Sequence, residues 1–279
     1  MRAKRSLGQN FLVDPNAQRR IAESLEAGPE TEVVEIGPGH GALTQHLAGT
    51  VRRLVLVELD DELAAALAAE FAGRGDVTVV HRDVLATDIA GLLERPEHAR
   101  VVGNIPYNIT TPILFHLLDT TPRPERIVVM IQKEVAERIL AQPGGKTYGA
   151  LSVAIRAVAE VERVLQVKRG AFRPVPDVDS TVIRITPRVP APLTRDEERD
   201  LRELTRAAFG WRRKQLGTIL RNAPEYALTP EELDALATAA GVTPDQRPET
   251  IDPRTFVTLS RALRRMGRPL GRRANAAGR

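Results

Sequence analysis

Short apolar runs alternate with helical patterns along the first half of the chain. Five of these runs predict buried strands, at residues 31–36, 54–58, 77–81, 100–103 and 127–131. Helical patterns follow two of them, at about residues 60–71 and 133–140. This alternation favours an α/β fold with a doubly wound, Rossmann-like parallel sheet that carries helices on both faces.

Beyond residue 150 the pattern changes. Residues 151–159, 161–167 and 180–185 predict further strands, and three prolines between Pro187 and Pro192 mark a linker. Only helical patterns follow, at about residues 194–209, 212–221, 230–240 and 253–266. We therefore expect a larger domain at residues 1–187 and a small all-helical domain at residues 188–279.

The composition excludes several classes of protein. The 279-residue chain has no cysteine, which excludes disulfides and thiolate-ligated zinc. Its five histidines are scattered, and no pair has a metal-binding spacing. No apolar run approaches the roughly 20 residues that span a bilayer, and the basic N-terminus lacks the apolar stretch of a signal peptide. We expect a cytoplasmic protein that uses neither a metal nor a membrane.

The charge is unevenly distributed. Residues 188–279 carry 18 Lys and Arg against 12 Asp and Glu, or +6, whereas residues 1–187 carry 22 against 24, or −2. Basic residues also gather at both ends of the chain, at Arg2, Lys4, Arg5, Arg261, Arg264, Arg265, Arg268, Arg272 and Arg273. Such clusters suit a polyphosphate backbone, and they suit a solvated surface equally well.

A glycine-rich segment stands where the first strand meets its helix. Gly37, Gly39 and Gly41 are spaced G-x-G-x-G, which differs from the G-x-G-x-x-G of pyrophosphate-binding loops. Glycines at the carboxyl end of a strand let the backbone approach a ligand. A plain strand-to-helix turn is the alternative.

Two acidic residues follow the next two strands. Glu58 ends the second strand and is placed to accept both hydroxyls of a ribose, while Asp83 follows the third and is placed to accept an adenine amine. The alternatives are a helix-start acid for Glu58 and a turn or capping residue for Asp83. Ligand-type residues at three consecutive strand ends indicate a nucleoside cofactor without a pyrophosphate, which favours S-adenosylmethionine.

The sharpest local signal is the tetrapeptide Asn104-Ile105-Pro106-Tyr107, at the end of the fourth strand. The N6 amine of adenine is a poor nucleophile, because its lone pair is delocalised into the ring. The Asn104 side-chain oxygen and the Ile105 carbonyl are suitable acceptors for its N–H groups, and Pro106 stiffens the turn. Tyr107 offers a flat face for the base. An Asn-turn before a proline is the alternative.

Two further segments are candidates for the same site. Phe172, in a proline-rich loop, is placed to cover the other face of a flipped base, and a hydrophobic plug is its alternative role. Residues 9–12 precede the first helix and are placed to close over the cofactor, unless they simply pack on the sheet.

Taken together, these segments resemble the ribosomal RNA adenine N6-dimethyltransferases, and more narrowly the bacterial small-subunit (16S) enzymes. The resemblance runs from about residue 6 to residue 185. Its motifs include residues 8–12, 35–39, 57–60, 104–108, 111–115, 132–135 and 148–152 and the Phe172 loop. It implies that S-adenosylmethionine is held by Asn10, Leu12, Gly37, Glu58, Asp83 and Asn104.

The resemblance also implies a substrate. This is a pair of adjacent adenosines in a hairpin loop near the 3′ end of 16S rRNA, each methylated twice, in the immature 30S subunit. The first domain then binds the cofactor and catalyses, and the helical domain grips RNA through residues such as Arg212, Arg213 and Lys214. A charged helix start is the alternative for these three residues. No oligomer signal is evident, so a monomer is expected.

Three competing functions remain open. The large-subunit (23S) rRNA methyltransferases of macrolide resistance share the fold and often have Ile at the position of Ile105, where small-subunit enzymes usually have Leu. The second is a non-catalytic ribosome-assembly factor, and the third is a small-molecule methyltransferase. The intact tetrapeptide argues against the second, and the basic helical region argues against the third.

Overall fold

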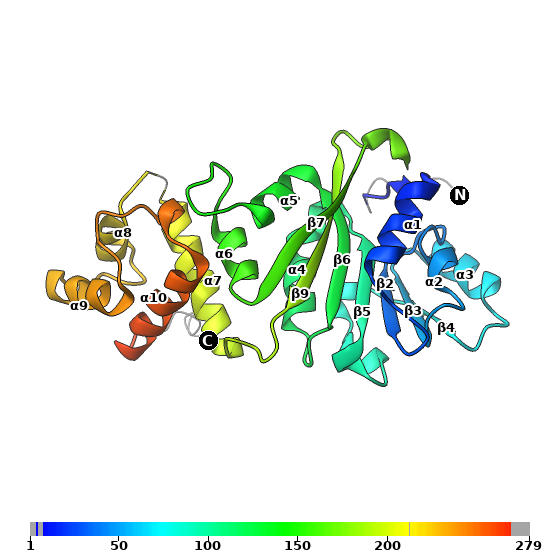
Figure 1. Ribbon diagram of the computed structural model, residues 1–279, viewed down its shortest axis with the longest axis horizontal. Coiled ribbons are helices and arrows are strands. Elements are labelled where there is room, and N and C mark those ends of the chain that lie inside the picture. The colour runs from blue at the N-terminus through cyan, green and yellow to red at the C-terminus, as the bar shows by residue number, and fades with distance from the viewer. Residues whose placement is uncertain (1–3, 5–7, 212, 269–279) are drawn as a thin grey trace, which may run out of the picture. The chain divides into compact units, whose positions relative to one another are not determined.

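The structure is a computed structural model that describes residue 4, residues 8–211 and residues 213–268 (Figure 1). The chain forms two compact units, one from residues 1–136 and 161–187 and the other from residues 137–160 and 188–279. The second unit therefore begins again at residue 188, where the sequence places a domain boundary. It also contains residues 137–160, which the sequence analysis assigned to the larger domain.

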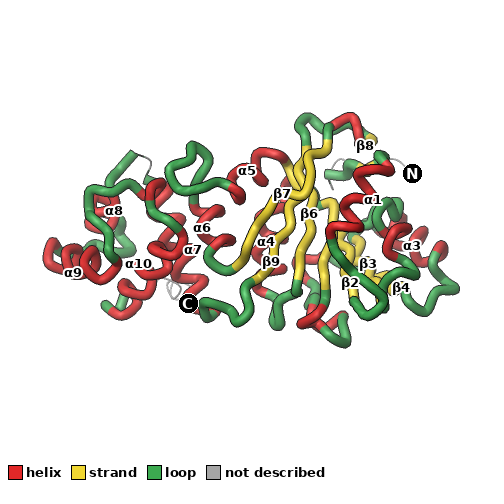
Figure 2. The backbone as a smooth tube through the Cα atoms, in the orientation of Figure 1, coloured by secondary structure: helices red, strands yellow, loops and turns green. Residues whose placement is uncertain are grey.

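A seven-stranded sheet forms the centre of the first unit, with the order β4-β3-β2-β5-β6-β9-β7 (Figure 2). The strands are β2 (Glu32–Ile36), β3 (Arg53–Glu58), β4 (Val77–His81), β5 (Arg100–Asn104), β6 (Arg126–Gln132), β7 (Ala159–Val167) and β9 (Ser180–Pro187). Strands β2 to β6 run parallel, and β9 pairs antiparallel with β6. Because the parallel strands end at one edge, the residues that follow them are brought close together.

Apolar residues on both sides of each central strand explain the near-continuous runs in the sequence. Leu54 and Leu56 of β3 are fully buried in the core cluster that includes Ile21, in the helix Pro15–Ser24. Val55 and Val57, which alternate with them, are buried on the opposite face. Parallel strands covered on both faces need such runs, because neither face meets solvent.

The helices of the first unit are α1 (Pro15–Ser24), α2 (Thr44–Leu47), α3 (Asp61–Glu70) and α4 (Thr110–Asp119), and α5 (Lys133–Leu140) continues into the second unit. Asp14 caps α1 by accepting from Asn16 N and Ala17 N. Asp60 caps α3, as its position before an acidic first turn predicts. Short 3-10 turns include η2 (Val84–Ala86) and η5 (Tyr107–Ile109), which follow β4 and β5.

A two-stranded ribbon is one element of the first unit that the sequence pattern does not reveal. Strand β1 (Phe11–Leu12) pairs antiparallel with β8 (Phe172–Arg173), which places Leu12 opposite Phe172. Each strand has only two residues, so no period can be read from the sequence. The ribbon joins the N-terminal segment to the proline-rich loop.

The second unit is helical, with α6 (Ala150–Arg156), α7 (Arg195–Gly210), α8 (Leu216–Asn222), α9 (Pro230–Ala240) and α10 (Pro253–Arg265). Thr194 with Glu197 and Thr229 with Glu232 form capping boxes that start α7 and α9. The prediction of a strand at residues 151–159 is wrong, because these residues form most of α6 and enter β7 only at Ala159. A short, wholly apolar run does not distinguish a buried helix from a buried strand.

The close approach of β2 and β5 at their carboxyl ends depends on Gly103. A Cβ atom at this position would lie 2.7 Å from the Ile36 carbonyl oxygen and 3.2 Å from the Ile36 Cβ. Real side chains do not tolerate such a contact with backbone. The absence of a side chain at Gly103 therefore brings the glycine loop after β2 beside the tetrapeptide after β5.

We expect Gly103→Ala to lower the free energy of unfolding by roughly 1–3 kcal/mol, because the added methyl must push the two strands apart. Gly28→Ala is the matched control, since no atom lies within 4 Å of a Cβ there. Guanidinium unfolding of the two variants provides the comparison, and equal midpoints would contradict the close-packing argument.

Candidate functional site

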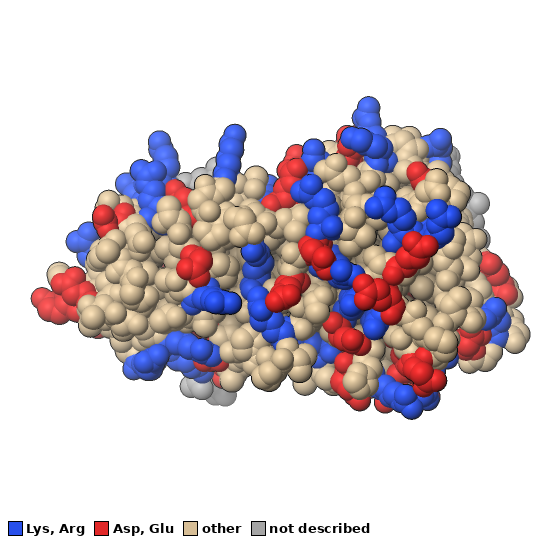
Figure 3. Space-filling view, viewed as in Figure 1, with Lys and Arg blue, Asp and Glu red and all other residues tan. Residues whose placement is uncertain are grey.

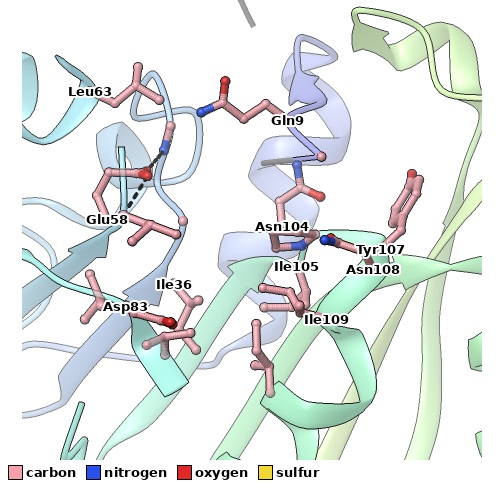
Figure 4. Close-up of a pocket in the computed structure, with 18 of the residues that line it drawn as sticks. Gln9, Ile36, Glu58, Leu63, Asp83, Asn104, Ile105, Tyr107, Asn108 and Ile109 are labelled. Carbon is pink, nitrogen blue, oxygen red and sulfur yellow. Dashed lines mark hydrogen bonds between the residues drawn. The ribbon is translucent and has the colours of Figure 1, made fainter. Parts of the chain in front are cut away.

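A cavity of about 270 Å³ lies at the carboxyl ends of the parallel strands, within the first unit (Figure 4). We call it the strand-end pocket. Its walls come from the N-terminal segment, the glycine loop and the ends of β3, β4 and β5. The lining residues are Gly8, Gln9, Asn10, Phe11, Ile36, Gly37, Gly39, Val57, Glu58, Leu59, Leu63, Arg82, Asp83, Val84, Leu85, Asn104, Ile105, Pro106, Tyr107, Asn108, Ile109 and Ile113.

The glycine loop adopts a conformation that disfavours other residues. Gly37 and Gly39 have φ values of 62° and 60°, in the left-handed region. At Gly39 a Cβ would also lie 2.9 Å from the ring of Phe11, so the missing side chain makes room for the N-terminal segment. Of the three glycines noted in the sequence, Gly37 and Gly39 line the pocket and expose backbone to it, whereas Gly41 is not part of the lining.

Glu58 connects the loop to β3. Its Oε2 accepts from Gly39 N at 3.0 Å, and its Oε1 accepts from Leu59 N and Asp60 N, each at 2.9 Å. The side chain is buried, and Figure 4 shows it on the pocket wall. A carboxylate has about four acceptor positions, so these three bonds leave one on Oε2. Glu58 therefore also holds the glycine loop in place, a task that the sequence analysis did not assign to it.

Asp83 lies beyond β4, on the far side of the pocket from Asn104 (Figure 4). Its Oδ1 accepts from Leu85 N at 2.9 Å and so caps the short turn η2. Its Oδ2 has no hydrogen-bond partner among the residues that the structure describes. The capping role and an open acceptor thus occur in the same exposed carboxylate.

Asn104 ends β5 with its side chain oriented by the N-terminal segment. Its Nδ2 donates to the carbonyl oxygen of Asn10 at 2.7 Å, which fixes the orientation of the amide. Its Oδ1 has no partner in the described part of the chain. An acceptor is consequently presented at the pocket, beside Ile105 and Pro106, which both line it (Figure 4).

Tyr107 begins the turn η5 and is one of the residues that line the pocket. The hydroxyl group shares a hydrogen bond of 2.7 Å with Ser180 Oγ at the start of β9. Partial burial raises the pKa of the Tyr107 hydroxyl above its usual value. The phenol therefore stays neutral at physiological pH, and the bond to Ser180 fixes the angle of the ring.

The N-terminal segment is attached at several points. Gln9 Nε2 donates to Asp60 Oδ2 at 2.9 Å, and Lys4 Nζ lies 3.0 Å from Asp60 Oδ1. The Phe11 ring packs against His40, with 4.3 Å between the ring centroids. Asp60, the cap of α3, was not among the residues selected from the sequence. Its helix-capping pattern hides its second role as an anchor for the segment.

Two residues predicted for the site lie outside the pocket lining. Leu12 is buried in the hydrophobic core, and its carbonyl accepts from Gln18 Nε2 at 2.9 Å. Phe172 is 0% exposed in the same core and pairs with Leu12 through the β1–β8 ribbon. In this conformation the Phe172 ring does not face a base in the pocket, because the ribbon turns it into the core.

Glu35 lies directly beneath the glycine loop. It belongs to the motif at residues 35–39, but no role was assigned to it from the sequence. It is fully buried, and burial raises the pKa of its carboxyl group to about 7. The charge of Glu58 raises this pKa further, whereas a hydrogen bond of 2.7 Å from Thr44 Oγ1 opposes the rise. Glu35 stands inside an apolar strand. No pattern in the sequence distinguishes such a buried carboxyl group from an acid that merely stabilises a helix or a turn.

Two arginines of α10 and one just after it are neutralised within the second unit. Arg261 pairs with Glu197, Arg264 with Asp200 and Asp196, and Arg268 with Glu232. Part of the basic cluster at the C-terminal end of the sequence therefore forms internal ion pairs. Of the other basic residues selected from the sequence, Arg2, Arg5, Arg212, Arg272 and Arg273 lie outside the described residues.

Arg213 and Lys214 keep their positive charges exposed. Both follow α7, and neither forms an ion pair within residues 8–211 or 213–268.

No group of three or more His, Asp or Glu side chains in the described residues is arranged to hold a metal ion. None of the described helices has the length and apolar character that crossing a bilayer requires.

A sheet of this order, with a glycine loop and two carboxylates at successive strand ends, defines the class of S-adenosylmethionine-dependent methyltransferases. The family model "Ribosomal RNA adenine dimethylase" matches residues 1–264. The chain belongs to this family. The predicted family, fold class, type of enzyme and cofactor are thereby confirmed.

Individual relatives agree with the family model. A ribosomal RNA small subunit methyltransferase A from Geobacter metallireducens is 42% identical over 269 residues, which cover 96% of this chain and 98% of that protein. A protein of the same name from Bacillus cereus strain B4264 is 43% identical over 265 residues, or 93% of this chain and 91% of that protein. The similarity therefore includes both compact units.

Two solved structures share the fold. A dimethyladenosine transferase from Plasmodium falciparum has a TM-score of 0.78 at 25% identity and covers 93% of this chain and 99% of its own. The 23S rRNA methyltransferase ErmE has a TM-score of 0.69 at 30% identity and covers 91% of this chain and 100% of its own.

The raised pKa of Glu35 predicts a specific dependence of stability on pH. Because the native state holds the proton more tightly than the unfolded state, the stability from Glu35 is complete below pH 4.5 and is lost as pH rises through about 7. The glutamine of Glu35→Gln cannot titrate. Between pH 4.5 and pH 8 we therefore expect the free energy of unfolding of the wild type to fall by about 3 kcal/mol relative to that of this variant.

Guanidinium unfolding at several pH values tests this expectation, and Glu70→Gln, at the exposed end of α3, is the control. Parallel stability curves for the wild type and Glu35→Gln would show that the Glu35 carboxyl ionises normally in the folded protein.

Proposed function

We propose that this protein transfers methyl groups from S-adenosylmethionine to N6 of two adjacent adenosines in a hairpin loop near the 3′ end of 16S rRNA, and dimethylates each. The observation that carries the proposal is the oriented carboxamide of Asn104, whose oxygen is left as an acceptor beside the pocket. The relatives named small subunit methyltransferase A support the choice of RNA.

The strand-end pocket has a donor and acceptor set that fits the cofactor. Glu58 Oε2 has one acceptor position left for a ribose hydroxyl, and Asp83 Oδ2 is open to the exocyclic amine of the cofactor's adenine. Gly37 and Gly39 line the pocket without side chains, so their backbone can approach a ligand. When bound, S-adenosylmethionine supplies a methyl group on a positively charged sulfur.

Asn104 and its neighbours are proposed to bind the target base. Asn104 Oδ1 and the Ile105 carbonyl accept the two N6–H bonds, so that the lone pair of the amine points into the pocket. Pro106 restricts the turn, and Tyr107 stacks on the base while its hydroxyl remains bonded to Ser180. Alignment supplies much of the rate, and no strong general base is required, because the amine becomes more acidic as the new bond forms.

Leu12 and Phe172 act indirectly in this proposal, through Asn10. Their pairing in the β1–β8 ribbon fixes the position of the neighbouring Asn10, whose carbonyl orients Asn104. Stacking of Phe172 on a base would require the ribbon to open. Their contribution is therefore to hold the N-terminal segment over the pocket.

The proposal further includes a monomeric, cytoplasmic enzyme that acts on immature 30S subunits. The unpaired bases of a hairpin loop cost less to extrude than paired ones, which suits an enzyme that must bring one base to the turn at residues 104–107. The second unit contributes RNA affinity through the exposed charges of Arg213 and Lys214. Four transfers for each particle require repeated exchange of the cofactor.

Methyl transfer to 30S particles that lack the modification tests the substrate directly. We expect four methyl groups on two adjacent adenosines, located by mapping of the modified bases. Transfer to naked 23S rRNA instead would favour the macrolide-resistance type of enzyme, to which ErmE is structurally similar. Cofactor binding without any transfer would favour a non-catalytic assembly factor, and transfer to a small molecule alone would refute the RNA assignment.

We expect Asn104→Ala to bind S-adenosylmethionine with an affinity within a few-fold of the wild type, but to lose roughly 10²–10³-fold in methyl transfer. The variant removes the acceptor that orients N6 and leaves Glu58 and Asp83 intact. Calorimetry measures cofactor binding, and single-turnover transfer measures the chemical step.

Asn16→Ala is the control for this experiment, because Asn16 lies on α1 outside the strand-end pocket. Normal single-turnover transfer by Asn104→Ala would rule out the proposed role of the carboxamide.

A further inference from the structure

The single tryptophan of the chain lies at the surface of the second unit. Trp211 follows α7 directly and is 38% exposed. Its neighbour Phe209 instead packs between Tyr148 and Phe256, with ring-centroid distances of 5.9 and 5.7 Å. The indole has no ring contact and no side-chain hydrogen bond in the described part of the chain. The aromatic packing of this unit is therefore complete without Trp211.

The charges around Trp211 are of one sign. Between Glu203 and Glu225 the sequence contains five basic residues and no acidic residue. Arg213 and Lys214, beside the tryptophan, are exposed and lack ion-pair partners among the described residues. Figure 3 shows basic side chains that stand out from the surface over the part of this unit that contains α8. This arrangement contrasts with Arg261 and Arg264 of α10, which are paired with acids.

The turn that carries these residues is fixed at both ends. Lys214 N donates to Trp211 O at 3.1 Å, and Arg213 has a φ of 68°, which reverses the chain. Leu216, at the start of α8, is buried, and its N donates to Gln246 O at 2.8 Å. An aromatic face and two cations are thus presented together from a short, anchored turn.

We propose that Trp211 stacks on an unpaired nucleobase of the RNA substrate, while Arg213 and Lys214 bind the adjoining phosphates. The inference rests on the proposed function, since it specifies how the second unit contacts that RNA. A flat aromatic surface beside unpaired cations matches a single strand, whose bases expose their faces next to a charged backbone. A duplex offers phosphates, 2′-hydroxyls and base edges but no exposed base faces, because its bases are already stacked on one another.

Intrinsic fluorescence tests the contact at one site, because no other tryptophan contributes to the signal. The probes are a single-stranded RNA dodecamer of mixed sequence and the fully paired duplex of the same sequence, each added to the full-length protein. We expect the single strand to quench Trp211 and the duplex to bind without quenching. Anisotropy of a labelled RNA measures binding independently of the tryptophan. If the single strand binds and the tryptophan emission does not change, the proposal is overturned.

Substitution separates stacking from simple apolar contact. Trp211→Leu keeps an apolar side chain and removes the π face, and Trp211→Phe keeps a smaller ring. We expect Leu to raise the KM for RNA roughly 5- to 150-fold with kcat unchanged, and Phe to restore part of the loss. Val189→Ala, at another exposed apolar residue of the same unit, is the control. Equal KM values for the wild type and Trp211→Leu would overturn the stacking role, and thermal melts verify that all variants fold.

The phosphate contacts have a separate signature. Arg213→Ala and Lys214→Ala should each weaken binding of both RNA probes and reduce the salt dependence of affinity by about one phosphate contact. Quenching at saturation should persist, since the indole remains. An unchanged salt dependence would show that these cations do not contact the backbone.

The two proposals fail in different ways. Quenching by single-stranded RNA without methyl transfer to any RNA would leave the stacking contact standing and refute the proposed reaction. Methyl transfer to 16S rRNA with a tryptophan that responds to no RNA would leave the reaction standing and refute the contact.

Discussion

The hydrogen bond from the Asn104 carboxamide to the Asn10 carbonyl connects the N-terminal segment to the end of β5. A carboxamide is nearly symmetric in shape but not in hydrogen bonding, because one end donates and the other accepts. Committing the donor end to Asn10 leaves the acceptor end for a substrate amine. The β1–β8 ribbon and the Gln9–Asp60 bond hold the segment that supplies this carbonyl. Much of the first unit therefore serves to keep one oxygen atom correctly oriented.

On the other wall of the pocket, each of two carboxylates both stabilises its own loop and keeps an acceptor position open. Glu58 accepts from one backbone N–H of the glycine loop and from two that follow β3, and it still retains one acceptor position. Asp83 caps a turn with one oxygen and leaves the other open. Side chains that hold their own loop in place are already ordered before a ligand arrives, so binding does not have to order them. Gly103 completes the arrangement by letting β2 and β5 approach closely.

The sequence allowed the central strands and the strand-end residues to be predicted, because parallel strands are marked by apolar runs and their ends by glycine, Glu58, Asp83 and Asn104. The helix at residues 150–156 was missed, since a short apolar run carries no usable period. Phe172 was placed at the base site, but a two-residue ribbon turns it into the core.

Charge was the least predictable property. The arginines at the end of α10 and just after it look like an RNA-binding cluster in the sequence, yet the fold pairs Arg261, Arg264 and Arg268 with acids of α7 and α9. Which charges stay free depends on contacts between helices. The paired residues of α7 and α10 are 64 or more residues apart in the chain. In the same way, the raised pKa of Glu35 comes from burial and from the nearby Glu58, and neither is visible in the sequence.

A crystal structure of the protein with an adenosine nucleotide and a non-transferable analogue of S-adenosylmethionine tests the central claim most directly. The account predicts that adenine N6 lies about 2.7–3.2 Å from Asn104 Oδ1 and about 3–3.5 Å from the position of the transferable methyl, on the line of its bond to sulfur. A methyl position that points away from the turn at residues 104–107, or an adenine bound elsewhere, would contradict it.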